Sequence, residues 1–247
     1  MKPAFEPVRA ALLEENENAQ IYEGFPFNAY ELKNLIFSVE EEKFAVALGR
    51  ALNRGLHSDE WIQKIPYKLP NGFPTAFKTR VLAFADSAEV VERLPSEDDL
   101  KNLHDLLKKL LQDFNAPIAK MDAFINRVLD DGVGYGPLGG FMRDPSLEEI
   151  MVNGNQRSVF VFNQKYGMCK TNVMIPAHEP IILQIINKAA KFTGKVFHEN
   201  EPLLDSRLPD GSRLNATFET VTPFGHSLTI RKFRTTMFSI IELVANG

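Results

Sequence analysis

Apolar residues recur at helical spacing in two neighbouring segments near the middle of the chain. Ser96 follows Pro95 and stands three residues before Asp99, which predicts a helix N-terminus where the two side chains cap backbone amides. The residues after this cap that share one predicted face are Leu100, Leu103, Leu106, Leu107, Leu110, Leu111 and Phe114. A second helix is predicted from Pro117 to Gly132, with its apolar face at Ile118, Met121, Phe124, Ile125, Val128 and Leu129. We expect these two helices to pack as a hairpin.

Weaker helical patterns precede this pair. Gly55 and a loop-forming stretch with Pro66, Pro70 and Pro74 separate them. The segments concerned are residues 30–38, 40–53 and 75–93. We therefore expect residues 1–115 to form a mostly helical accessory region.

The periodicity changes to that of β-strands after Glu149. Strands are predicted around residues 150–152, 159–162, 167–175, 203–208, 213–220 and 227–233, with a helix at 179–192. Turn-forming sequences separate them at residues 153–155, 209–211 and 223–225. The predicted fold class is α+β, with a helical N-terminal region followed by an antiparallel sheet with flanking helices.

Composition agrees with a globular protein of 247 residues, and the length favours two domains. The formal net charge is −4, so no overall positive field attracts nucleic acid or anionic lipid, and we expect no nucleic-acid partner. The charge is uneven: residues up to Val133 carry a net −6 and the rest a net +2. The single cysteine, Cys169, and a start without a secretory leader favour a reducing cytoplasm. No uncharged apolar run is long enough to span a bilayer.

Several motifs of catalysis are absent or out of context. Residues 134–139 match a loose Gly-x-Gly-x-x-Gly pattern, but a helix precedes them and Pro137 interrupts them, so a connector is favoured over a dinucleotide site. No phosphate-binding loop of the Gly-x-x-x-x-Gly-Lys-Ser/Thr type occurs. The histidines at positions 57, 104, 178, 198 and 226 lack the spacing of a zinc site. We expect no metal site and no catalytic residue in this chain.

The most informative stretch runs from Asp205 to Ala216 and resumes at Leu228. Between Ser206 and Arg234 the chain carries a local charge of +3, and its arginines alternate with apolar residues. Arginine suits phosphate because its planar fork donates two aligned hydrogen bonds and keeps its charge. Pairing of these arginines with Asp205 or Asp210 on a solvated strand is an equally good interpretation.

Four ordered motifs lie between about Ile118 and Arg234. They are Gly-Tyr-Gly-Pro-Leu at 134–138, Asp-Pro with Glu-Glu-Ile-Met-Val-Asn-Gly at 144–154, the run at 205–216, and Leu-Thr-Ile-Arg-Lys-Phe at 228–233. Together they resemble the N-terminal domain of the traffic ATPases of type II and type IV secretion. The resemblance is nearest to the branch that serves tight-adherence pili, conjugation-type export and archaeal surface filaments.

This resemblance implies a PAS-like domain at 116–234 and a linker at 235–247 toward a RecA-like domain, whose Walker motifs this sequence lacks. It implies a homohexamer in which ATP with Mg²⁺ lies between the two domains and is held mainly by the RecA-like one. The arginines that reach the phosphates would be Arg213 and Arg231, with Arg207 as a third candidate. The implied partners are the RecA-like domain, neighbouring subunits and an inner-membrane platform protein, at the cytoplasmic face of the membrane. The chain alone is expected to be inactive.

Two other hypotheses remain. The helical first half could dock a partner while the sheet serves as scaffold, which would make the chain a non-enzymatic module of a secretion or filament assembly machine. A self-contained enzyme would have to use Cys169 and the histidines.

Overall fold

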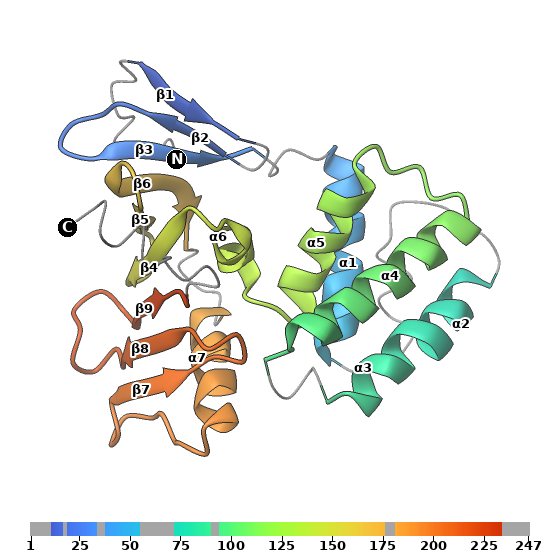
Figure 1. The fold of residues 1–247 in the computed structure, drawn as a ribbon. Coiled ribbons are helices and arrows are strands. Elements are labelled where there is room, and N and C mark those ends of the chain that lie inside the picture. Colours follow the sequence, from blue (N-terminus) through green and yellow to red (C-terminus); the bar gives the residue numbers. More distant parts are fainter. Residues whose placement is uncertain are drawn as a thin grey trace, which may run out of the picture.

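The computed structural model describes residues 11–16, 19–33, 38–54, 72–89, 94–175 and 181–233 (Figure 1). The strands are β1 (Leu12–Glu15), β2 (Ala19–Tyr22), β3 (Asn28–Leu32), β4 (Leu147–Asn153), β5 (Ser158–Asn163), β6 (Gly167–Met174), β7 (Leu203–Arg207), β8 (Arg213–Thr217) and β9 (Ser227–Arg231). The helices are α1 (Val39–Arg54), α2 (Phe73–Phe77), α3 (Ala83–Ser87), α4 (Glu97–Asp113), α5 (Met121–Gly132), α6 (Gly139–Arg143) and α7 (Ile181–Phe192). A π-helical turn, η2 (Lys78–Leu82), joins α2 to α3, and a 3₁₀ turn, η3 (Gly136–Leu138), precedes α6. The α+β class is confirmed.

The strands of the described residues form one sheet in the order β1-β2-β3-β6-β5-β4-β9-β8-β7. Neighbouring strands are antiparallel except β3 and β6, which run parallel. Figure 1 shows α6 and α7 on the side of the sheet that faces the remaining helices. Burial alternates along the strands: Leu214 and Ala216 of β8 are buried, whereas Arg213 and Asn215 are exposed. One face of the sheet therefore packs on helices and the other carries its polar side chains outward.

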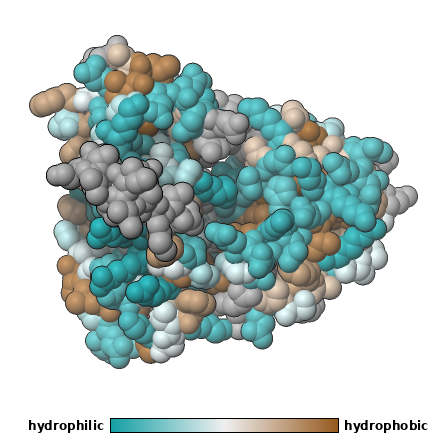
Figure 2. All heavy atoms as spheres, viewed as in Figure 1, coloured by the Kyte–Doolittle hydropathy of each residue, from teal (hydrophilic) through white to brown (hydrophobic). Residues whose placement is uncertain are grey.

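Two hydrophobic cores stabilise the molecule. The sheet core joins strand residues such as Ile150, Val161 and Leu214 to Ile185 of α7. The helical core joins α1, α2, α4 and α5 through large side chains that include Phe44, Phe73, Leu107 and Phe124. In the view of Figure 2, hydrophilic side chains cover most of the helical layer's surface. The predicted amphipathic helices thus bury their apolar faces against one another.

The predicted helical pair is present, with a shift at one end. Asp99 N–H donates to Ser96 Oγ at 3.2 Å, and Ser96 N–H donates to Asp99 Oδ2 at 2.9 Å, so α4 begins with the predicted capping box. The second helix, α5, begins at Met121 instead of Pro117. The N–H of Ala119 donates to Glu41 Oε1 of α1 at 3.1 Å, so this segment bonds across to another helix before α5 starts.

The prediction of a helix at residues 30–38 was wrong, because residues 28–32 form strand β3. Such a short segment fits either structure by its own pattern, and partners distant in sequence decide it. Tyr30 of β3 lies opposite Thr171 of β6, and Asn172 bonds both the N–H and the C=O of Leu32, at 3.1 and 3.3 Å. The buried hydroxyl of Tyr30 also donates to Asp144 Oδ2. Three strands from the range expected to be helical therefore belong to the main sheet.

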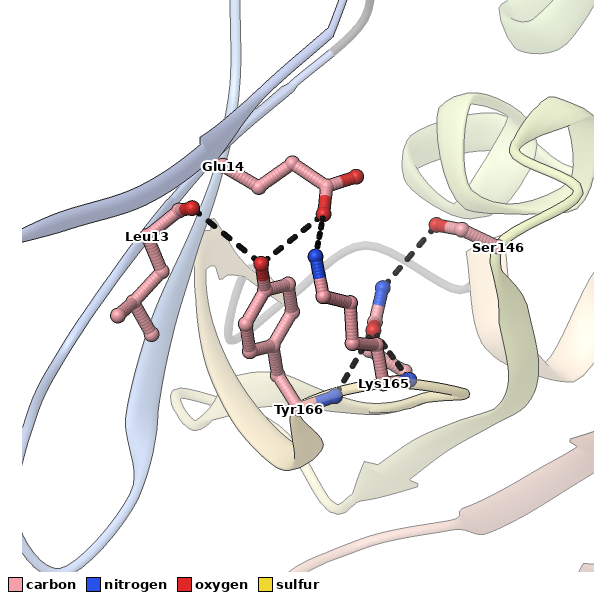
Figure 3. Close-up of polar contacts among 6 residues, drawn as sticks. Leu13, Glu14, Ser146, Lys165 and Tyr166 are labelled. Carbon is pink, nitrogen blue, oxygen red and sulfur yellow. Dashed lines mark hydrogen bonds and ion pairs between the residues drawn. The ribbon is translucent and has the colours of Figure 1, made fainter.

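Strand β1 is also tied to the turn between β5 and β6 (Figure 3). Tyr166 Oη donates to Leu13 O at 3.2 Å and to Glu14 Oε2 at 3.0 Å, and Lys165 Nζ bonds the same carboxylate oxygen at 3.1 Å. These contacts connect the edge strand β1 to the turn between β5 and β6, across β2 and β3. The linker predicted at 235–247 and the predicted loop signals at Gly55, Pro66 and Pro70 lie outside the described residues.

Candidate functional site

The three arginines predicted from the sequence lie side by side on the exposed face of the sheet. Arg207 of β7 stands opposite Arg213 of β8, and Arg213 stands opposite Arg231 of β9. All three side chains are exposed. Adjacent strands are about 4.8 Å apart, so this arginine row extends over about 10 Å. That is the length of a di- or triphosphate chain, and the positive charges point to the same side.

A tight turn sets the register of the row. Gly211 adopts a φ of 86°, which favours glycine, and Leu208 N–H donates to Ser212 O at 2.8 Å. Asp210 accepts from both the N–H and the hydroxyl of Ser212, at 3.0 and 2.7 Å. Phe233 N–H then donates to Ser212 Oγ at 3.0 Å. The turn is thereby fixed to the end of β9, which holds all three strand ends together.

Arg213 is already paired on this surface. Its Nε and Nη2 donate to the two carboxylate oxygens of Asp205, at 2.9 and 2.6 Å. The side chain of Arg213 is 68% exposed and that of Asp205 is 49% exposed. The hydrogen bonds from Arg213 hold the pKa of Asp205 below its usual value. Arg207 and Arg231 form no ion pair with any other described residue.

The structure adds a fourth cation, Lys195, that the sequence pattern does not indicate. Lys195 follows the end of α7, and its Nζ donates to the backbone oxygen of Asp205, next to the arginine row. No local sequence pattern indicates Lys195, because its nearness to β7 depends on the packing of α7. Ser206 makes that packing: its hydroxyl donates to Ala189 O at 2.9 Å on the buried face.

The glycine-rich segment at 134–139 is a connector, as the sequence predicted. It joins α5 to α6, and the two helices are locked by Arg143, which donates to both oxygens of Asp130 at 2.8 and 2.7 Å. A Cβ at position 139 would lie 2.0 Å from Asp130 Oδ1. Gly139 therefore makes room for the carboxylate, and no nucleotide is needed to explain it.

Lys232, in the last of the four motifs, also has a structural position. Its Nζ donates to Phe141 O at 3.0 Å and to Asp144 O, at the C-terminal end of α6. Burial lowers its pKa. The motif at 228–233 therefore carries one arginine turned to solvent and one lysine that anchors α6.

Cys169 and the described histidines do not form a catalytic arrangement. Cys169 is buried, and burial raises the pKa of its thiol to about 11, so it is protonated near neutrality. His226 packs against Phe197 and Phe218, and its Nδ1 accepts from Glu219 N–H. In the described ranges there is no group of three or more histidine, cysteine, aspartate or glutamate side chains that could hold a metal ion. His57 and His178 lie outside those ranges.

Comparison with known proteins gives relatives without an assigned activity. No known protein-family profile matches the chain. Uncharacterized protein MJ0781 of Methanocaldococcus jannaschii is 42% identical over 106 residues, which cover 43% of this chain and 14% of that protein. MJ0900 of the same organism is 34% identical over 127 residues, which cover 51% and 23%. MJ1288 is 35% identical over 121 residues, which cover 49% and 46%. The matches thus span less than half of each of these relatives.

Among solved structures, the VirB11 ATPase of the Brucella suis type IV secretion system, crystallised with sulphate, is a weak neighbour. The likeness covers 45% of this chain and 32% of that protein, with 22% identity and a TM-score of 0.38. In the described part of the chain, none of the helices has the length and apolarity required to cross a membrane.

Proposed function

We propose that this chain is the N-terminal module of a hexameric secretion or pilus-assembly ATPase. In this proposal the arginine row reaches the terminal phosphates of ATP with Mg²⁺, and a RecA-like domain holds the rest of the nucleotide. Movement of the module relative to that domain then transmits the nucleotide state to an inner-membrane platform at the cytoplasmic face. The observation that carries the proposal is the register of Arg207, Arg213 and Arg231 in one exposed row.

The chemistry of the row supports this role. Three guanidinium groups on one face stabilise negative charge that develops on a phosphoryl group, as arginine does in phosphoryl transfer. Arg231 and Arg207 are available without breaking an ion pair among the described residues. Arg213 has to leave Asp205. Because both side chains are highly exposed, the loss of this ion pair costs little free energy. The four sequence motifs that resemble those of the traffic ATPases also assign phosphate contact to these three arginines.

Two measurements test the proposal. In this chain, titration with ATP·Mg²⁺ or tripolyphosphate should shift the NMR signals of the Nε–H groups of Arg207, Arg213 and Arg231. Arg80, which pairs with Asp113 on the helical layer and is also exposed, is the control and should not shift. In the protein that joins this chain to a RecA-like domain, Arg213→Ala and Arg231→Ala should each lower kcat about a hundredfold, whereas Arg80→Ala should leave it unchanged. Full ATPase activity in both row variants would contradict the assignment.

A second candidate function is docking of a partner by the helical layer. The observation in its favour is that α1, α2, α4 and α5 have a core of their own, separate from the sheet core. The acidic first turn of α4, with Glu97, Asp98 and Asp99, gives this layer a charged surface. Charge reversal by Asp98→Lys should then abolish capture of a platform protein from membranes, while Arg231→Ala should not. The opposite pattern would exclude docking through this layer.

A further inference from the structure

A cleft of about 500 Å³ lies between the helical layer and the sheet. Leu100, Lys101 and Asn126 are on its helical side, from α4 and α5. The other side is formed by α6, by the β7–β8 turn and by the residues that follow β9. A cleft of this size suits a small organic molecule. It is separate from the arginine row, none of whose members lines it.

Tyr135 lines this cleft and has an unsatisfied hydroxyl. The residue is 8% exposed, and its Oη has no hydrogen-bond partner among the described residues. Burial, and after it the nearby Asp210 carboxylate, raise the pKa of the phenol, so it remains a hydrogen-bond donor. Buried hydroxyl groups in folded proteins nearly always have a partner. A ligand in the cleft would supply one.

The charges in the cleft favour an anion. Three carboxylates line it: Asp130 accepts two bonds from Arg143, Asp210 accepts two from Ser212, and Glu97 is exposed to solvent. The cations retain unused donors: Lys101 has no ion pair in the described part of the chain, and a guanidinium has more N–H groups than the two that Asp130 takes. Lys101 and Arg143 therefore offer free N–H groups to an anion, whereas the solvent-exposed Glu97 is the lining carboxylate that neither of them pairs with.

The remaining walls are apolar. Leu100, Met142 and Phe233 line the cleft, and Phe233 is 58% exposed. Exposed aromatic and methionine side chains around a few polar groups are typical of sites for amphipathic ligands.

We propose that this cleft binds a small organic anion that carries an aromatic ring, with Lys101 and the Tyr135 hydroxyl as partners of the anionic group and Leu100, Met142 and Phe233 as partners of the ring. Aryl or nucleoside phosphates and aromatic carboxylates share this chemistry. The site does not depend on the proposed ATPase role, because the arginine row takes no part in it.

Three probes separate the contribution of the anionic group to binding from that of the aromatic ring. Phenyl phosphate carries both the ring and the anion, inorganic phosphate carries only the anion, and benzyl alcohol carries only the ring. In calorimetry with this chain, phenyl phosphate should bind at least about tenfold more tightly than either of the others. In NMR spectra it should shift the Met142 methyl and Tyr135 ring signals. Phenylacetate and adenosine monophosphate then show whether the carboxylate or the phosphate is preferred.

Matched variants test the two polar partners. Tyr135→Phe removes only the hydroxyl and should weaken phenyl phosphate binding about fivefold. Lys101→Gln should weaken it about tenfold, whereas Lys109→Gln, on the same helix but outside the cleft, should not change it. Arg213→Ala should also leave binding unchanged, which separates this site from the arginine row.

The proposal is overturned if inorganic phosphate binds as tightly as phenyl phosphate, or if Tyr135→Phe and Lys101→Gln both bind like the wild type. It is likewise overturned if the shifts appear at the arginine row and vanish in Arg213→Ala. Thermal unfolding of each variant confirms that the fold is intact.

Discussion

Two arginine–aspartate pairs in this protein are both bidentate but differ in the exposure of their carboxylates. Arg213 donates two bonds to Asp205, and Arg143 donates two bonds to Asp130. Asp205 is 49% exposed, whereas Asp130 is 12% exposed. The first pair lies on the open face of the sheet, and the second lies where α5 meets α6 beneath Gly139. The Arg213–Asp205 pair can therefore open in water, whereas the Arg143–Asp130 pair stabilises the fold.

The physical reason lies in the solvent. Water screens the exposed pair and competes for its hydrogen bonds, so it stabilises the fold little and Arg213 can exchange Asp205 for another anion. At the second pair, burial opposes the charge of Arg143, but the Asp130 carboxylate outweighs this and raises the pKa of the guanidinium. Burial raises the pKa of Asp130, and removal of Arg143 would leave this carboxylate without its partner, whereas Arg143 itself is 43% exposed. A bidentate pair is thus not by itself a sign of a binding site.

The largest test of this contrast removes each aspartate in turn. Asp130→Ala should lower the free energy of unfolding by about 3 kcal/mol, because Arg143 loses two charge-assisted hydrogen bonds and the α5–α6 contact opens. Asp205→Ala should leave the unfolding free energy unchanged within error. Urea denaturation of the two variants and the wild type measures both values. Equal losses in the two variants would remove the distinction between the pairs.

A smaller effect concerns a half-buried cation that has no carboxylate partner among the described residues. Lys188 of α7 donates to Val133 O at 3.3 Å, at the end of α5, and burial lowers its pKa to about 8. Between pH 8 and 10 the unfolded chain still holds a proton at this amine that the folded protein has lost. The free energy of unfolding should therefore rise with pH in this window, by about 2 kcal/mol.

Lys188→Met should lack this rise, and the exposed control Lys109→Met should retain it. Urea denaturation at several pH values between 7 and 10 provides the comparison. A wild-type curve parallel to that of Lys188→Met would show that the amine is solvated. Burial would then shift the pKa values of the Arg143–Asp130 pair but not the pKa of Lys188.

The smallest effect is at the exposed pair. Arg213→Gln removes the hydrogen bonds that lower the pKa of Asp205, so that pKa should rise toward its usual value while the melting temperature stays the same. The folded pKa of Asp205 is depressed, so any stability from this pair is present at neutral pH and is lost as the pH falls through that pKa. Side-chain NMR titration of Asp205 follows the change. An unaltered titration in Arg213→Gln would show that the pair does not persist in solution.

Local patterns were enough to predict several features. The capping box at Ser96 was identified because it depends on residues three positions apart. The turn at residues 209–211 was identified because proline, aspartate and glycine favour a turn by their own backbone preferences. The alternation in the last strands predicted that arginines would stand on one face. Contacts between residues far apart in the sequence were not predicted. β3 pairs with β6 some 140 positions further along the chain, and Lys195 contacts β7 only because α7 packs there.

The sequence by itself determined the α+β class, the faces of the amphipathic helices and the outward direction of Arg207, Arg213 and Arg231, because each follows from side-chain periodicity along one element. Only the tertiary structure decided that the three arginines stand in one row, since register is set between strands. It also decided which of the two aspartate carboxylates is largely buried and where the cleft beside Tyr135 lies. Burial and juxtaposition depend on elements that pack from distant parts of the chain, and no local pattern records them.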